Sequence, residues 1–458
     1  MQAVRVLKFG GTSVGDAANI RKVVEVIRSR AGAVPIVVFS AMGDTTDALA
    51  AIGRAASEGR AGEAAAALSS LREAHGALVE TLLAGRGSGV WSSCAPLFDQ
   101  IEAMARGLAV LEDFSPAVQD RLLGFGEILS TRILCEVLRG EGMPVAWVDA
   151  REVVVTDDRH TQAEPLFEAT AARAAEVLSP LVRSGQIPVT QGFIARSSAG
   201  AMTTLGRGGS DFTASLLGAA LGAEEIEIWT DVDGIMTADP SLVPAAKNIP
   251  VMSFQEASEL AFFGARVLHP KTLAPAVERG IPVRVLNTSR PERPGTVIVA
   301  SSPPGGGPVK SIAYKEGMVV VNLVSARMFK ARGFLRRVFE TLDRHRIAPD
   351  LVSTSEVSVA LAVTPWAHLE SAVEELRGLG TVSVLTGQAV VAVVGDGLKG
   401  TPGILGQVFR DLDDLRVAMV SEGGSEVAVS FVVEERDLPA VVSRLHRRFF
   451  ETEDDRGS

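Results

Sequence analysis

The sequence predicts an α/β protein: a three-layer sandwich with a mainly parallel sheet over residues 1–299, followed by two ferredoxin-like α+β units. Two observations carry this prediction. Apolar runs of strand length alternate with helical patterns through the first two thirds of the chain. After a Pro- and Gly-rich stretch, the pattern changes to a weak β-α-β-β-α repeat. A length of 458 residues, 47% of them hydrophobic, is enough for several domains.

Six apolar runs are predicted to form the strands of the first sheet. Most are continuous rather than alternating, which is typical of parallel strands buried on both faces. They are Val4–Lys8, Pro35–Ser40, Pro144–Val148, Ile187–Gly192, Ile226–Thr230 and Pro282–Leu286. The Ala-rich stretch 53–83 and residues 115–140 have helical patterns, and the first of these reads as a helical excursion from the sheet.

The C-terminal third is predicted to hold two βαββα-type units. The first has strands and helices at 318–324, 331–344, 350–354, 357–363, 369–379 and 382–385. The second has them at 389–394, 403–412, 417–421, 427–433 and 438–449 and lacks a final strand. We expect Lys310–Tyr314 to supply that strand, so that the first unit is inserted into the second. The predicted boundaries are 1–299, a linker at 300–308, a first unit at 316–387, a second unit at 309–315 with 388–452, and a tail at 453–458.

Charge and cysteine content narrow the function classes. A net charge of −10 argues against nucleic-acid or anionic-membrane partners, which need clustered Lys and Arg. Cys94 and Cys135 are isolated and match no metal or disulfide spacing, so we expect a reducing, cytoplasmic location. The six histidines are scattered, and no metal site made by protein side chains is expected.

The first motif is Val6–Val14, in which an apolar strand runs into Lys8, Gly10, Gly11 and two hydroxyl residues before an amphipathic helix. Strand, glycine turn and helix together present backbone N–H groups to an anion. Lys8 adds a mobile cation that can follow charge on a phosphoryl oxygen. An ordinary βα turn with one surface lysine explains this stretch equally well.

The second motif is Thr203–Thr213, where three glycines surround Arg207 and Ser210-Asp211 begin a helix. The planar guanidinium suits a carboxylate or phosphate bidentately. A turn with an N-cap pair accounts for Ser210 but not for the glycines and arginine together, so we favour a functional loop.

Other stretches indicate a functional site less strongly than these two motifs. Trp229–Pro240 places acidic residues after a buried strand, and Phe263–Pro270 and Ser40–Asp47 are turns beside helices. Glu127 is a lone carboxylate in an apolar helical pattern, which is costly without a cation. Its partner is either an arginine of the fold or a substrate ammonium.

Taken in order, five motifs resemble those of the aspartate kinases of the amino-acid kinase superfamily. They are Lys8–Ser13, Phe125–Glu127, Leu205–Thr213, Trp229–Pro240 and Phe263–Pro270. The C-terminal pair resembles tandem ACT domains, and Gly333–Leu335 with Thr354–Leu361 are similar to the monofunctional, lysine-sensitive type. The resemblance implies transfer of the γ-phosphate of Mg-ATP to the side chain of L-aspartate, which gives 4-phospho-L-aspartate on the route to lysine, methionine and threonine.

The resemblance also implies roles for individual residues. Lys8 would stabilise the transferring phosphoryl group, and Asp211 would orient Lys8 or the metal-bound phosphates. Arg207 would hold a carboxylate of aspartate and Glu127 its ammonium. The implied substrate contacts are Thr46, Glu127, Arg207, Gly208, Gly209 and Ser210. The implied ATP contacts are Lys8, Phe9, Gly10, Gly11, Ser13, Ser40, Thr230, Asp231, Met236, Ser241, Arg266 and Val267. Met236, Ser241 and Arg266 depart from the residues usual in the family.

Regulation by an amino acid is a further implication. The implied effector contacts are Met328, Gly333, Leu335, Asp350, Ser355 and Glu356. Lysine is the expected inhibitor, although Lys330 would repel a cationic ligand, and threonine or no inhibition stay open. The ACT domains are expected to form a homodimer. Two other functions stay open: an amino-acid sensor without turnover, and an amino-acid kinase that acts on glutamate or acetylglutamate.

Overall fold

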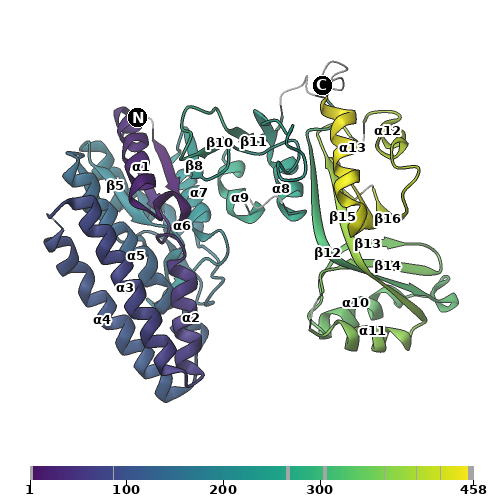
Figure 1. The fold of residues 1–458 in the computed structure, drawn as a ribbon, viewed down its shortest axis with the longest axis horizontal. Helices are drawn as coiled ribbons and strands as arrows, with labels where there is room; N and C mark the ends of the chain where they lie inside the picture. Colours follow the sequence, from purple (N-terminus) through teal and green to yellow (C-terminus); the bar gives the residue numbers. More distant parts are fainter. Residues whose placement is uncertain are drawn as a thin grey trace. The chain divides into compact units, whose positions relative to one another are not determined.

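The computed structural model describes residues 4–85, 87–264, 269–302, 307–365, 367–398, 400–422 and 424–451. It divides into two compact units (Figure 1). The first contains the chain up to Ile235, together with Pro250–Phe254 and the stretch that ends at Ser301. The second contains Met236–Ile249, a stretch that begins at Gln255, and the chain from Ser302 onward. No helix in the described ranges is both long enough and apolar enough to cross a membrane.

The first unit is built on an eight-stranded sheet in the order β3-β5-β2-β1-β8-β10-β11-β9. Every neighbouring pair is parallel except β10 and β11. The strands are β1 (Arg5–Phe9), β2 (Ile36–Phe39), β3 (Val145–Val148), β5 (Ile187–Gln191), β8 (Glu225–Thr230), β9 (Val251–Ser253), β10 (Val283–Asn287) and β11 (Thr296–Val299). All six predicted strands are therefore confirmed, and the short β9 and β11 were not predicted. Side chains of β1, β2, β5 and β8 are buried on both faces, as expected for the middle layer of a sandwich.

Helices cover this sheet. Helix α7 packs against both α6 and α9, and α5 packs on β2, β3 and β5. Helices α2, α3 and α4 pack together and extend away from the sheet in Figure 1; the excursion predicted at 53–83 covers the end of α2 and all of α3. The bounds are α1 (Ala17–Arg30), α2 (Thr45–Ser57), α3 (Ala61–Leu83), α4 (Ser88–Leu111), α5 (Pro116–Gly140), α6 (Phe167–Arg183), α7 (Gly209–Leu221) and α9 (Pro270–Glu278). A second, small sheet contains β4 (Val155–Thr156), β6 (Ile194–Ser197) and β7 (Met202–Thr204).

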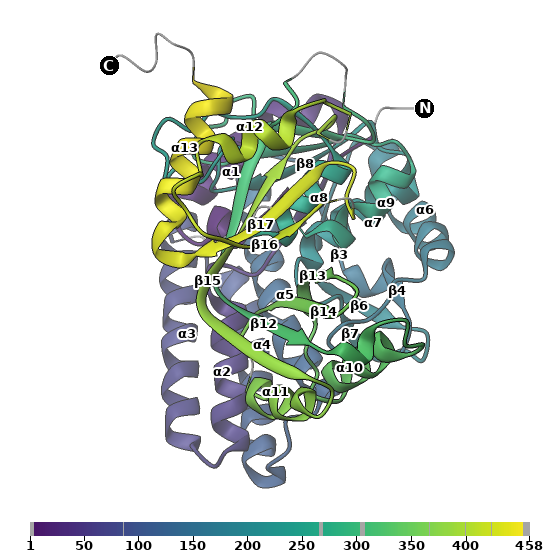
Figure 2. The same ribbon diagram turned by 90° about the vertical axis from the view of Figure 1, so that its right-hand side faces the viewer.

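The second unit has one six-stranded sheet in the order β13-β14-β12-β15-β17-β16, whose long strands β12 and β15 are visible in Figure 2. Each pair of neighbouring strands in this sheet is antiparallel. The strands are β12 (Ser311–Val324), β13 (Pro349–Thr354), β14 (Ser358–Val363), β15 (Thr381–Val394), β16 (Val417–Ser421) and β17 (Ala428–Glu434). The helices that follow them are α10 (Phe334–Arg344), α11 (Leu369–Arg377), α12 (Ile404–Arg410) and α13 (Leu438–Phe450).

The strand expected at Lys310–Tyr314 pairs with the second repeat, because Ser311 lies opposite Val394 and Tyr314 opposite Val391. Four strands that were predicted separately in this region are joined into two long strands in the structure. Residues 311–314 and 318–324 both belong to β12, which shifts register between Lys315 and Val320, and residues 382–385 and 389–394 both belong to β15. The two repeats therefore share one sheet rather than having one each.

Two segments before residue 299 belong to the second unit. Ala238 and Val243 lie in its hydrophobic core with residues of β12, β15 and α13. The hydroxyl of Thr237 is 3.0 Å from Nε2 of the buried His446. On α8 (Phe254–Phe262), the buried Glu256 accepts a hydrogen bond from Lys310 Nζ at 2.9 Å. The boundary at residue 299 stays a prediction; these contacts show that the chain enters the second unit before it.

The helical excursion contains a buried histidine, and its burial makes the stability of the folded chain depend on pH. His75 on α3 has Nδ1 2.9 Å from the carbonyl oxygen of Leu71, and its ring packs edge-on against Phe98. Burial lowers its pKa below the ordinary value of 6.5. The unfolded chain therefore binds the proton more readily than the folded one, and stability falls as the pH drops through about 6.5.

We predict that His75→Leu reduces this acid sensitivity. Between about pH 7.5 and about pH 5.5, the wild-type melting temperature should fall by about 2–4 °C more than that of the variant. Differential scanning calorimetry at both pH values measures the difference. His368→Leu, at an exposed position, is the matched control. Equal pH dependence in wild type and His75→Leu would contradict the assignment.

Candidate active site

The turns that carry the predicted motifs meet at the carboxyl edge of the main sheet. Phe9, at the end of β1, lies opposite both Phe39 and Trp229 in the parallel register. Backbone hydrogen bonds then link the turns: Gly10 N donates to Trp229 O at 3.1 Å, and Gly43 N donates to Gly11 O at 3.0 Å. Ligands of open α/β sheets bind at this edge.

A cleft of about 320 Å³ lies between these turns and the start of α7. Ten of the predicted site residues line it: Lys8, Gly11, Ser40, Thr46, Glu127, Arg207, Gly208, Gly209, Ser210 and Asp211. Four further lining residues were not assigned from the sequence: Ala41, Gly43, Phe193 and Gly206. Three of these lie inside motifs that the sequence singled out, whereas Phe193 carries no local signal.

A buried ion pair occupies one wall of the cleft. Lys8 Nζ lies 2.7 Å from Asp211 Oδ1, and each side chain is only about a tenth exposed. Asp211 is in the first turn of the 13-residue helix α7, and Gly208, with φ of 71°, is the N-cap. That left-handed conformation favours glycine. The N-terminus of a helix offers free backbone N–H groups to an anion, and a lysine beside it adds a cation.

Glu127 lies on another wall, on α5, and is only 3% exposed. Its Oε1 accepts a hydrogen bond from Ala41 N at 3.3 Å. Its Oε2 has no hydrogen-bond partner among the described residues. Because burial disfavours the ionised form, the pKa of Glu127 rises from 4.5 to about 8. No arginine or lysine in the described ranges pairs with it, so the fold supplies no cation for this carboxyl group there.

Arg207 is the complementary group. It is exposed, lies in the loop between β7 and α7, and lines the cleft. Within the described ranges its guanidinium has neither an ion-pair nor a hydrogen-bond partner. The cleft therefore presents an unpaired carboxylate and an unpaired guanidinium, beside the Lys8–Asp211 pair. This set suits a small zwitterionic acid next to a phosphate.

The residues assigned to ATP differ from one another in exposure and in the groups that they contact. The Phe9 ring is fully buried, with its centroid 5.5 Å from that of Phe39 and 6.1 Å from that of Trp229, so only its backbone is available to a ligand. Ser13 Oγ is 2.7 Å from Thr288 Oγ1. Thr230 is the last residue of β8 and the exposed Asp231 follows it; the Thr230 hydroxyl donates to the Asp231 carboxylate at 3.1 Å.

Four further residues are assigned to ATP by the resemblance: Met236, Ser241, Arg266 and Val267. Met236 and Ser241 belong to the second unit. The carbonyl of Met236 accepts a hydrogen bond from Ser311 Oγ at 2.8 Å, and the hydroxyl of Ser241 donates to Asp239 at 2.7 Å. Arg266 and Val267 lie outside the described residues.

A pocket of about 650 Å³ in the first repeat contains most of the predicted effector residues. Met328, Gly333, Leu335, Ser355 and Glu356 line it. Asp350 does not line it, because its carboxylate accepts hydrogen bonds from Lys315 Nζ at 2.6 Å and Thr364 Oγ1 at 3.0 Å. The cations Lys330 and Arg336 line the pocket as well.

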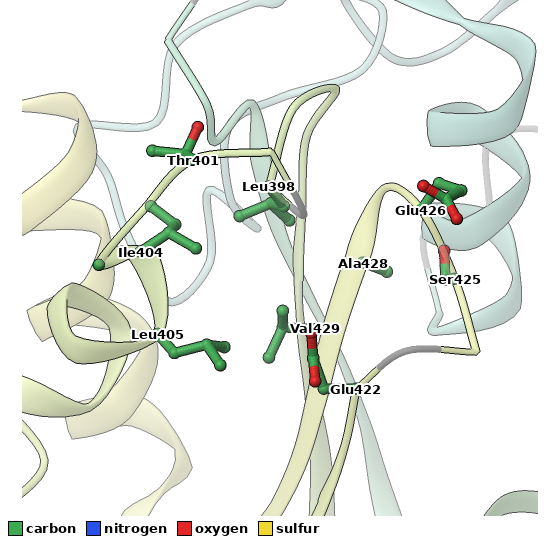
Figure 3. A pocket seen from close by; sticks show the side chains of 10 residues that line it. Leu398, Thr401, Ile404, Leu405, Glu422, Ser425, Glu426, Ala428 and Val429 are labelled. Carbon is green, nitrogen blue, oxygen red and sulfur yellow. The ribbon is translucent and has the colours of Figure 1, made fainter.

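The second repeat has a smaller pocket, of about 160 Å³, at the equivalent place (Figure 3). The turn before α12 and the hairpin between β16 and β17 form it, as the turn before α10 and the hairpin between β13 and β14 form the larger one. Two short segments that line the larger pocket are repeated in the sequence at the smaller one. Gly403-Ile404-Leu405 repeats Gly333-Phe334-Leu335, and Ser425-Glu426-Val427 repeats Ser355-Glu356-Val357.

Comparisons with known proteins agree with this geometry. The family model described as "Amino acid kinase family" matches residues 3–287, and one described as "ACT domain" matches residues 391–449. The lysine-sensitive aspartokinase 3 of Escherichia coli is 38% identical over 461 residues, which cover 98% of this chain and 100% of the relative. The chloroplastic aspartokinase 1 of Arabidopsis thaliana is 36% identical over 464 residues, which cover 98% of this chain and 80% of the relative.

Solved structures agree as well. The crystal structure of E. coli aspartokinase III in complex with aspartate and ADP matches with a TM-score of 0.84 and 38% identity, over 98% of this chain and 100% of that chain. The structure of the same enzyme with lysine and aspartate matches equally well. The predicted fold class is thereby confirmed, and the chain belongs to the amino acid kinase family and, within it, to the aspartokinases.

Proposed function

We propose that the chain transfers the γ-phosphoryl group of ATP to the side-chain carboxylate of L-aspartate, giving 4-phospho-L-aspartate and ADP. The observation that carries this proposal is the buried Glu127 carboxylate, whose Oε2 lacks a partner among the described residues and lines the same cleft as Arg207 and Lys8. L-Aspartate has one ammonium and two carboxylates. Glu127 would hold the ammonium and Arg207 one carboxylate, which leaves the other carboxylate for reaction.

The chemistry requires no nucleophile from the protein. An oxygen of the aspartate side chain attacks the γ-phosphorus, the bond from this phosphorus to the bridging oxygen of ADP breaks, and no proton has to move. Catalysis is then positioning and charge neutralisation. Lys8 would follow the charge on the transferring group, Asp211 would hold Lys8, and Gly10, Gly11 and the first N–H groups of α7 would surround the phosphates.

Mg²⁺ fits this site as a companion of the nucleotide. In the described ranges, no group of three or more His, Cys, Asp or Glu side chains is placed to hold a metal ion. Asp211 would supply a hard oxygen ligand, and the phosphates and water the rest. When bound, Mg²⁺ would neutralise phosphate charge. On the nucleotide side, Thr230 and Asp231 at the end of β8 remain the proposed contacts.

Regulation and assembly are part of the proposal. We propose L-lysine as an inhibitor that binds the first-repeat pocket, with a homodimer formed through the ACT repeats and a cytoplasmic location. The relative of known structure that binds lysine supports the effector. Glu356 provides a carboxylate for the cationic side chain, while Lys330 and Arg336 favour the α-carboxylate.

The role of Lys8 is tested by Lys8→Met. We predict that kcat falls about 100-fold or more, because removing one preorganised donor to a transition-state charge costs about 3 kcal/mol. Aspartate-dependent ADP formation measures kcat, and circular dichroism checks the fold. Lys22→Met, on α1, removes a lysine that does not line the cleft and should leave kcat unchanged. A near-normal kcat in Lys8→Met would reject this role.

The role of Glu127 predicts a pH profile. Only the ionised carboxylate attracts an ammonium, and its pKa is about 8 in the empty protein. The wild-type kcat/KM for aspartate should therefore rise by about tenfold per pH unit from about pH 6 and level off near pH 8. Glu127→Gln should lower kcat/KM and flatten this rise. An unchanged profile in Glu127→Gln would exclude an ionised Glu127 as the ammonium partner.

The effector site is tested by inhibition. Added L-lysine should raise the aspartate concentration at half-maximal rate in wild type, because an effector that prefers one state shifts the population toward it. Glu356→Gln should weaken the inhibition about tenfold, since one charged contact is lost. Glu426→Gln, the equivalent change in the second pocket, is the matched control. Loss of inhibition only in Glu426→Gln would move the effector to the second repeat. No response to lysine in wild type would remove the claim.

A further inference from the structure

A second buried carboxylate on α5 is not used by the chemistry described so far. Asp120 is in the second turn of α5 and is 0% exposed. It lies seven residues before Glu127, so the two side chains lie two turns apart on the same face of the helix. Helix α5 packs on β7, the strand that leads into the Arg207 loop.

Hydrogen bonds from three residues surround this carboxylate. Oδ1 accepts from Thr204 Oγ1 at 2.5 Å and from Thr161 N at 3.0 Å. Oδ2 accepts from His160 Nδ1 at 2.7 Å, and Thr161 N is also 3.0 Å from it. A buried charge costs little when its lone pairs are filled in this way, and charge-assisted bonds hold their donors firmly.

Two of these donors, Thr204 and Thr161, lead to the Arg207 loop. Thr204 is the last residue of β7, three positions before Arg207, and its carbonyl accepts from Ala163 N at 2.9 Å. Gly206 packs so closely against the 161–162 segment that a Cβ on it would lie 3.1 Å from Thr161 O. Asp120 therefore fixes both the start of the loop and the backbone against which the loop rests.

We propose that Asp120 is a positioning residue for the aspartate subsite. Through Thr204 and Thr161, it sets where Arg207 stands relative to Glu127, which the same helix carries. The guanidinium of the exposed Arg207 has no hydrogen-bond or ion-pair partner in the described ranges, so its position depends on the backbone of its loop. The functional consequence rests on the proposed function, because it assigns Arg207 and Glu127 to the substrate.

A neighbouring threonine provides the control. Thr203 and Thr204 are adjacent on β7 and both are buried. Thr204 bonds to Asp120, whereas Thr203 Oγ1 is 2.7 Å from Thr156 Oγ1. Thr204→Val and Thr203→Val therefore remove the same hydroxyl from neighbouring positions, and only the first removes a bond to Asp120. Thr204→Ser keeps that hydroxyl.

In kinetics with the full chain, Asp120→Asn and Thr204→Val should raise the KM for aspartate about tenfold, with the KM for ATP within about twofold of wild type. Thr203→Val and Thr204→Ser should stay near wild type. An unchanged KM for aspartate in both Asp120→Asn and Thr204→Val would overturn the proposal. So would an equal rise for both substrates, or the same effect in Thr203→Val.

Hydrogen exchange gives a measurement that does not depend on turnover. Without ligands, the amides of 205–209 should exchange about tenfold faster in Asp120→Asn and Thr204→Val than in wild type, but not in Thr203→Val. Unchanged exchange would overturn the positioning role even if the enzyme is active. The two proposals can fail separately. If the wild-type chain releases no ADP with aspartate, but the variants exchange faster than wild type as predicted, the proposed function is contradicted and the anchoring of the loop by Asp120 still holds.

Discussion

The ion pair between Lys8 and Asp211 is the contact on which the arrangement of the cleft depends. It joins the end of β1 to the first turn of α7, two elements about 200 residues apart in sequence, at 2.7 Å and largely out of water. Removing one partner from such a pair leaves an uncompensated buried charge, which costs about 3–5 kcal/mol. The pair therefore holds the N-terminus of α7 beside the glycine turn, and Gly11 and the first residues of α7 line one cleft.

Helix α5 organises the opposite wall. Asp120 fixes the approach to the Arg207 loop, and Glu127 lies two turns further along. One turn beyond Glu127, Thr131 Oγ1 accepts hydrogen bonds from Gln191 Nε2 at 2.7 Å and Trp147 Nε1 at 3.1 Å, which hold the helix on β5 and β3. Sites on rigid elements are held more accurately than sites on loops alone. The groups that select aspartate in our proposal are thus attached to one helix, directly or through its hydrogen bonds.

Sequence reasoning succeeded where the signal is local. Strands β1 and β8 are continuous apolar runs, and the glycines beside Lys8 and Arg207 mark turns that must approach a ligand closely. It also left Glu127 with two possible partners, and only the packing of α5 shows that no described cation of the protein pairs with it. Long-range contacts carried no such signal. Asp120 meets partners 40 and 84 positions away, and nothing in its own helix predicts them. Segment 236–249 forms no helix or strand and is broken by Pro240 and Pro244, so its place in the second core could not be predicted from a periodic pattern.

The unpaired Glu127 shows how specificity and stability oppose each other in this fold. A carboxylate with a pKa of about 8 makes the folded state bind a proton that the unfolded chain has released above pH 4.5, so its ionisation destabilises the empty protein as the pH rises. An arginine of the fold could remove this cost, but it would also occupy the place of the ligand ammonium. In the proposed complex, a bound ammonium offsets the desolvation of the ionised carboxylate, so that binding stabilises the folded state. A carboxylate ligand without an ammonium would leave the cost in place, so the same group that weakens the empty cleft rejects the wrong acid.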